Sequence, residues 1–182
     1  MKINYDKIDW TKINEWLVKY LWIMKWIKNL NVFENEDFRR KFKWYYRIMR
    51  KSEEFYNIYF KYFEDNKNKK VTFEQTLKFF FDKLDRIESS FSSKIVATIN
   101  PNFPILDSQV LKNLWIKIPV YNLEKKERFN IMIKNYNKII IEYSDFLKNK
   151  EWEEAIKIFD ENIWKVNITD IKKIDFMLWQ SR

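Results

Sequence analysis

Apolar side chains recur every three or four positions along most of this chain, which is the spacing of one face of an α-helix. The clearest stripe predicts a helix over about 10–27. Its members are Trp10, Ile13, Trp16, Leu17, Tyr20, Leu21, Met24 and Ile27. Asparagines near 31–35 predict a loop, and the apolar pattern then continues through Phe38, Phe42, Tyr45, Tyr46 and Met49.

Polar residues at the ends of the stripes predict where further helices begin. Ser52 is a good N-cap, and the two glutamates that follow it suit the positive end of a helix dipole. Thr72 and Gln75 have the spacing of a capping box, which predicts a helix from Thr72 to about Asp85. The charged stretch 65–70 between these two helices is expected to be a solvated loop.

Turn and cap signals divide the second half of the chain in the same way. The predicted elements are a hairpin near 87–92, a helix over 93–99, a loop over 100–106 that holds two of the three prolines, a helix capped by Asp107, a break at Pro119, a long helix from Asn122 to about 149, and helices over 151–163 and 169–179, the last capped by Thr169. The fold class is therefore all-α, and the chain is expected to form a single compact multi-helix domain over 1–182.

The composition excludes several kinds of chemistry. The chain has no cysteine and no histidine, which rules out disulfides, thiolate metal sites, histidine general bases and most zinc sites. It also has no glycine, so glycine-rich phosphate loops are excluded. Catalysis would have to use Lys, Asp, Glu, Tyr, Ser or an organic cofactor; we expect neither a metal nor a cofactor.

Lysine and arginine total 35 against 26 aspartates and glutamates, a formal net charge of +9. This balance favours nucleic acid or an anionic membrane as the partner. The alternative is codon bias from an AT-rich genome, which also enriches lysine. The N-terminus lacks the apolar run of a signal peptide and no apolar window approaches 18 residues, so we expect a cytoplasmic monomer with no membrane partner.

One segment combines residues that carry chemistry. Lys94 opens an apolar helical run, a prolyl loop follows, and Asp107 opens the next helix. A neutral lysine amine can attack C1′ of a nucleoside and displace the base, leaving a Schiff base. Burial against Phe91 and Ile95 would lower the lysine pKa, and the carboxylate would stabilise the developing positive charge.

This segment resembles the helix-hairpin-helix core of the base-excision DNA glycosylase superfamily, and especially its 8-oxoguanine glycosylase/lyase members. Ser90-Phe91-Ser92 occupies the position of the glycine-rich hairpin, and Lys94 falls where those enzymes carry their nucleophile. Phe103-Pro104-Ile105-Leu106-Asp107 is similar to the phrase that holds their aspartate. The resemblance covers about thirty of the 182 residues.

The resemblance implies a DNA N-glycosylase with AP-lyase activity that acts on double-stranded DNA and removes a damaged base, such as an oxidised purine. It implies a helix-hairpin-helix lobe over 33–118 and a second lobe made of 1–32 with 119–182. Lys94 and Asp107 would be catalytic, and Trp179 would contribute to the base pocket. The residues that would contact phosphate, with serine hydroxyls in place of the glycine amides, are Ser89, Ser90, Phe91, Ser92 and Ser93.

Simpler interpretations remain open for each feature. Lys94 can be a solvent-facing lysine, Asp107 only an N-cap, and Trp179 a core residue. The basic and aromatic run 39–47 can track a nucleic-acid backbone or form an amphipathic helix. The alternative functions are a non-catalytic helix-hairpin-helix module that binds nucleic acid, and a helical interaction protein unrelated to DNA. A cleft joining Lys94 to Asp107 would favour the enzyme.

Overall fold

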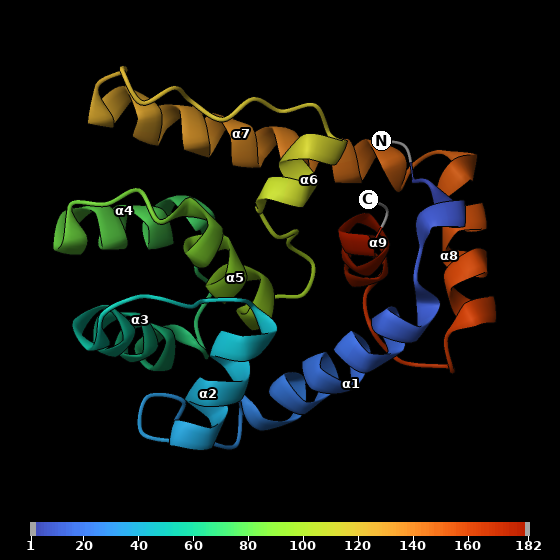
Figure 1. The fold of residues 1–182 in the computed structure, drawn as a ribbon, viewed down its shortest axis with the longest axis horizontal. Helices are drawn as coiled ribbons and strands as arrows, with labels where there is room; N and C mark the ends of the chain where they lie inside the picture. The colour runs from blue at the N-terminus through green and yellow to red at the C-terminus, as the bar shows by residue number, and fades with distance from the viewer. Residues whose placement is uncertain (1–2, 181–182) are drawn as a thin grey trace.

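The computed structural model describes residues 3–180, and within that range it consists of helices joined by loops, without any strand (Figure 1). The all-α prediction is confirmed. After a 3-10 turn at Tyr5–Lys7, the helices are α1 (Trp10–Trp26), α2 (Glu36–Tyr45), α3 (Glu53–Asn66), α4 (Phe73–Leu84), α5 (Ser89–Ile99), α6 (Ser108–Asn113), α7 (Lys125–Phe146), α8 (Lys150–Asn162) and α9 (Asp170–Gln180).

Most of the predicted helix starts are correct because they depend on local hydrogen bonds. Ser52 accepts a hydrogen bond from the first turn of α3, and Thr72 and Gln75 form both halves of a capping box at the start of α4. The start of α7 was predicted wrongly. Asn122 lies in a turn, and the helix begins after Glu124, which makes no side-chain capping hydrogen bond.

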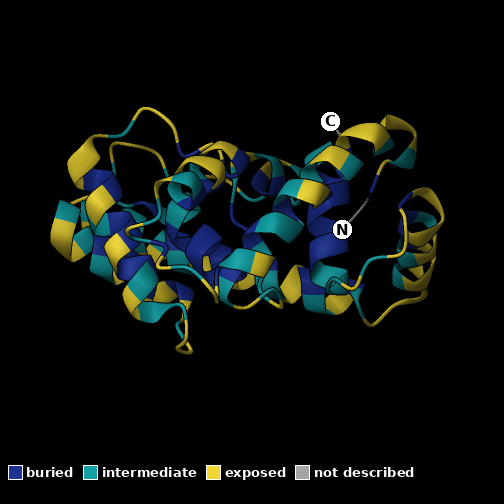
Figure 2. Cartoon of the chain, turned by 90° about the horizontal axis from the view of Figure 1, so that it is seen from below, coloured by how far each residue is buried: buried dark blue, intermediate teal, exposed yellow. Residues whose placement is uncertain are grey.

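Aromatic rings fill much of the core, and most helices have a buried side and an exposed side, whereas α5 and α9 have no exposed residue (Figure 2). With no glycine and two alanines, the chain separates its helices by large side chains. A continuous group of rings joins α2, α3 and α4 and consists of Phe38, Phe42, Tyr59, Phe60, Phe63 and Phe80. Most of the run 39–47 therefore lies in the amphipathic helix α2, in which Phe42 and Tyr45 are buried and Trp44 is exposed.

Helices from distant parts of the sequence pack together. In Figure 1, α2 to α5 gather on one side, α8 and α9 lie on the other, and α1 and α7 run along opposite edges. The packed pairs include α1 with α9, α4 with α7, and α6 with α9. Since α6 belongs to the predicted first lobe and α9 to the second, the two predicted lobes meet here; the lobe boundaries themselves stay a prediction.

The connection between α4 and α5 differs from the predicted hairpin. The turn consists of residues 85–88, with Asp85 in the left-handed conformation at φ 50° and Glu88 at the N-cap of α5. Ser90-Phe91-Ser92, which was predicted to form the hairpin, lies inside α5. Aspartate tolerates the left-handed region better than most residues, so the turn forms without glycine and earlier in the chain than expected.

Candidate active site

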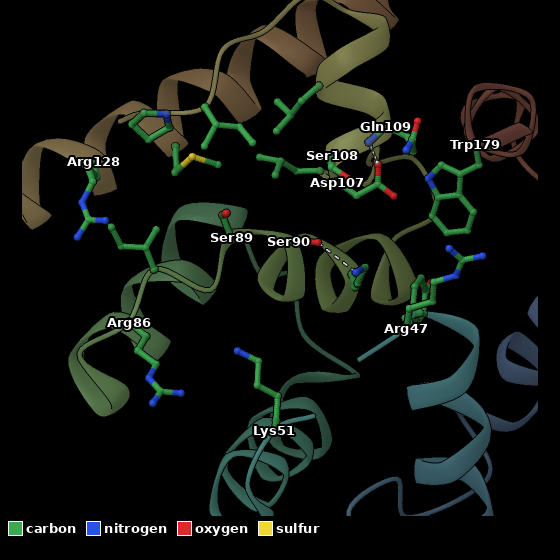
Figure 3. Close-up of a pocket in the computed structure, with 18 of the residues that line it drawn as sticks. Arg47, Lys51, Arg86, Ser89, Ser90, Asp107, Ser108, Gln109, Arg128 and Trp179 are labelled. Atoms are coloured by element: carbon green, nitrogen blue, oxygen red, sulfur yellow. Dashed lines mark hydrogen bonds between the residues drawn. The ribbon is translucent and has the colours of Figure 1, made fainter. Parts of the chain in front are cut away.

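A cavity of about 900 Å³ lies between the α4–α5 turn, α5, α6, α7 and α9 (Figure 3). Its wall contains six basic residues and two carboxylates. The basic residues are Arg47, Lys51, Arg86, Lys94, Lys125 and Arg128, and the carboxylates are Asp85 and Asp107. The apolar part of the wall includes Trp16, Tyr45, Leu111, Met132 and Trp179. The excess of positive charge favours an anionic ligand with an apolar or aromatic part.

Lys94 projects from the middle of α5 and is the most deeply buried basic side chain of this wall, with 6% of its surface exposed. Its Nζ donates a hydrogen bond to Ser90 Oγ at 3.1 Å and lies 5.1 Å from the centre of the Phe91 ring. The pKa of Lys94 is lowered to about 8, mainly by burial; the charge of Asp107 opposes the shift and the charge of Arg47 adds to it. The amine is thus neutral far more often than an exposed lysine at the same pH.

Asp107 caps α6, as the sequence predicts. Its Oδ1 accepts hydrogen bonds from the amides of Gln109 at 2.9 Å and Val110 at 3.0 Å. The side chain is half-buried and lines the cavity that Lys94 also lines. The two residues that the sequence paired are therefore brought to one cavity, and the carboxylate acts on the lysine amine through its charge.

The prolyl loop 100–106 holds Asp107 in place relative to Lys94. Side chains from α5, from α7 and from the residue before α9 form hydrogen bonds with this loop. The bonds are Leu106 N to Ser93 Oγ at 2.9 Å, Tyr136 OH to Pro104 O at 3.0 Å, and Thr169 Oγ1 to Pro101 O at 2.8 Å. Ser93 belongs to α5, so its hydroxyl ties the start of α6 directly to the helix that carries Lys94.

The serines before Lys94 divide into two pairs. Ser89 and Ser90 line the cavity and are half-buried. Ser92 and Ser93 are fully buried, and their hydroxyls bond to the carbonyls of Glu88 and Ser90. In this structure Ser92 and Ser93 cannot touch a phosphate, contrary to their predicted role.

Phe91, the remaining member of the predicted hairpin, packs sideways against Phe55 and Tyr59. Its ring faces the amines of Lys51 and Lys94 at 4.9 and 5.1 Å from its centre. The ring is therefore part of the lysine environment, and cation–π attraction partly offsets the cost of burying the ammonium.

Trp179 reaches the cavity from α9, and its role in a base pocket stays a prediction. Its ring contacts Trp16 edge-on at 6.1 Å and Tyr45 at 6.1 Å between ring centres. The Trp179 ring thus forms part of an aromatic wall, and in Figure 3 it lies at the same end of the cavity as Arg47.

Of the arginines at the cavity, Arg47 ends the basic run 39–47 noted in the sequence, whereas Arg86 and Arg128 were not predicted. Arg47 stands over the Trp16 ring at 5.3 Å, and in Figure 3 Arg86 and Arg128 lie near the opposite end. Arg128 Nε is buried and has no hydrogen-bond partner among the described residues, while its guanidinium lies 5.5 Å from the centre of the Tyr121 ring. An unpaired buried donor in a cavity wall is available to a ligand.

Other kinds of site find no support in the part of the chain that the structure describes. Within residues 3–180, no three Asp or Glu side chains gather as a metal site would require. None of the helices in that range is both long and apolar enough to cross a membrane. Comparison of the chain with protein-family models, with curated proteins and with solved structures finds no match to any of them.

Proposed function

We propose that this protein is a DNA N-glycosylase with AP-lyase activity, in which Lys94 is the nucleophile and Asp107 stabilises the positive charge that develops on the sugar. The observation that carries the proposal is that both side chains line one basic cavity, together with the aromatic wall of Trp179. The proposed substrate is a damaged base in double-stranded DNA, of the oxidised-purine class, and the proposed working form is a cytoplasmic monomer.

The chemistry follows from the state of the lysine. With a pKa of about 8, roughly a tenth of the Lys94 amines are neutral at pH 7, against about 0.03% for an ordinary lysine. The nitrogen lone pair attacks C1′, the glycosidic bond breaks, and the base leaves with the bonding electrons and takes up a proton. Loss of the amine protons and opening of the sugar ring give the imine, from which β-elimination breaks the 3′ phosphate ester.

Asp107 supports this step by electrostatics. The C1′–N bond breaks through a transition state with positive charge on the sugar, and a carboxylate across the cavity lowers its energy. The two amide hydrogen bonds to Asp107 Oδ1 hold the carboxylate in position at the start of α6. These bonds leave the carboxylate unable to rotate freely, which is the fixed geometry that such stabilisation requires.

The cavity also has what a phosphate backbone needs. Glu88 makes no side-chain cap to α5, so within the described residues the first amides of that helix lack a side-chain acceptor. Ser89 and Ser90 stand at this helix end and line the cavity, where the helix dipole favours an anion. Arg47, Arg86 and Arg128 add charge around them. These features support DNA as the ligand over a partner without phosphates.

The test is reductive trapping. Borohydride should cross-link the protein to a strand that carries an abasic site or an oxidised purine, since the imine is reduced to a stable amine. Lys94→Gln cannot form the imine, so its cross-link should disappear while DNA binding persists. Asp107→Asn keeps the helix cap, because asparagine caps as well as aspartate, and should slow trapping by about 100-fold.

A non-catalytic nucleic-acid-binding module is the second candidate, and one observation favours it. The hydrogen bonds of Asp107 and Lys94 are fully explained by helix capping and by Ser90, so both residues have structural roles. A wild-type protein that binds DNA and traps no strand on any oxidised or abasic duplex would establish this module in place of the enzyme. A helical interaction protein unrelated to DNA would show neither result.

A further inference from the structure

The segment between α6 and α7, residues 114–124, carries the two most exposed of the large apolar side chains in the part of the chain that the structure describes. Trp115 is 92% exposed and Tyr121 is 93% exposed, and Ile118 and Val120 are each 59% exposed between them. Single exposed apolar residues are normal on a protein surface, but four within seven positions form a patch, and such patches mark interaction sites.

This segment is held in place. Trp115 has φ 56°, the left-handed conformation that usually falls to glycine at the end of a helix, and its amide bonds to the carbonyl of Lys112 at 3.1 Å. Asn135 of α7 is buried and donates a hydrogen bond from Nδ2 to Lys117 O at 2.9 Å. The segment runs beside α7 to that helix's start (Figure 1). The exposed rings are therefore presented on a fixed support.

The patch is continuous with the basic cavity. Ile118, Pro119 and Tyr121 belong to both, and the guanidinium of Arg128 lies 5.5 Å from the centre of the Tyr121 ring. Aromatic faces beside arginines are the arrangement that binds unpaired nucleobases, because each base stacks on a ring while its phosphate meets a cation. A base inside a duplex presents only its edges, so rings of this kind select bases that are out of the stack.

We propose that residues 114–124 form a stacking platform for unpaired bases that flank the nucleotide in the cavity, with Trp115 and Tyr121 as the stacking rings. The proposal rests on the proposed function in one respect, that the ligand is a DNA strand, and it adds that the strand is single or locally opened beside the target. A lipid surface is the other ligand that exposed rings near basic side chains can bind. Tyr121 lines the basic cavity as well as being exposed to solvent, and a negatively charged strand that enters the cavity suits this position better than a bilayer does.

The experiment measures binding of a fluorescent single-stranded oligonucleotide of about 15 nucleotides by anisotropy. Trp115→Ala and Tyr121→Ala should each weaken binding by about 5- to 100-fold, the loss associated with one base–aromatic stack. The salt dependence of the affinity should not change, since no phosphate contact is removed. Trp164→Ala is the matched control, because Trp164 is 52% exposed and lies outside the cavity wall, and it should bind like the wild type.

Two results would overturn the platform. The first is a Trp115→Ala/Tyr121→Ala double variant that keeps wild-type affinity for the oligonucleotide and a wild-type melting curve. The second is a double variant that loses binding to phosphatidylserine vesicles while its oligonucleotide affinity is unchanged, which would assign the patch to membranes. Trapping on lesion duplexes is measured separately. If the wild type traps strands and the double variant binds the oligonucleotide as tightly as the wild type, only the platform is refuted. If the two rings are needed for oligonucleotide binding but the wild type traps no strand, only the glycosylase is refuted.

Discussion

Replacing Lys94 with methionine should make the protein more stable at neutral pH. The native structure buries the Lys94 ammonium, and its pKa falls from 10.5 to about 8 as a result. Multiplying this difference by 1.36 kcal/mol for each pKa unit gives about 3 kcal/mol of destabilisation from the buried charge. Methionine has a similar shape and no charge, so Lys94→Met should recover about 2–3 kcal/mol, less what the contacts with Phe91 and Ser90 contribute.

The gain has a pH dependence with a definite sign. Below about pH 8 the lysine is protonated in both the folded and the unfolded chain, and the full cost is present. Between about pH 8 and 10.5 the unfolded chain binds a proton that the folded chain does not, so the free energy of unfolding of the wild type rises with pH. The advantage of the variant should therefore shrink over this window and leave only a packing difference above it.

Urea unfolding of both proteins from about pH 6 to 10.5 measures this directly. At pH 7 the gain corresponds to a melting temperature about 4–10 °C higher for a chain of this length. Lys83→Met is the matched control, because Lys83 is an exposed lysine of α4 and its loss should change stability by no more than about 0.5 kcal/mol. A Lys94→Met protein that is less stable than the wild type at pH 7, or a gain independent of pH, would refute the reasoning.

Two further predictions concern charged groups near the cavity. Arg47→Gln removes a positive charge that lowers the pKa of Lys94, so an NMR titration of the Lys94 side chain should give a higher pKa than in the wild type. Lys172→Met should cost about 3–5 kcal/mol in urea unfolding, because it leaves Asp175, which is 1% exposed, as a buried carboxylate without its 2.7 Å ion pair. Adding Asp175→Leu should recover part of this loss, since the uncompensated charge is then gone.

Each of these predictions has a result that would contradict it. Arg50→Gln is the control for Arg47→Gln. Arg50 is also exposed and also has a left-handed backbone conformation, but it lies outside the cavity wall. An equal shift of the Lys94 pKa in both variants would show that proximity to the cavity is irrelevant. For the buried pair, a Lys172→Met protein within about 1 kcal/mol of the wild type would mean that Asp175 takes up a proton or finds water at little cost.

Local signals in the sequence predicted the helices and several of their caps. The N-caps at Ser52 and Asp107 and the capping box at Thr72 follow from side chains within three residues of the amides that they bind. The sequence left open whether Lys94 is buried against Phe91 or faces solvent. The structure buries it beside Phe91, and both residues lie on α5, although Phe91 was predicted to lie in a hairpin. The turn before α5 was misplaced because the sequence offers no glycine, and Asp85 supplies the left-handed position instead.

Features that depend on packing between distant segments could not be predicted. Arg86 follows α4 and Arg128 lies on α7, and they share a wall only because those two helices pack together. Lys172 and Asp175 have the spacing of an ordinary exposed pair on a helix, and only the tertiary structure buries them, with Tyr143 as a third member. No pattern in the sequence distinguishes such a pair from the many exposed ones.

The contact between Trp16 and Trp179 has a consequence for the order in which this protein can fold during synthesis. The two rings meet edge-on in the cavity wall, yet one belongs to α1 and the other to α9. Helices α2 to α5 can pack on one another as they emerge from the ribosome, whereas the aromatic end of the cavity cannot form until α9 has been made. Until then Trp16 lacks its ring partner, and the side of α1 that packs on α9 stays uncovered while α2 to α5 are already in contact.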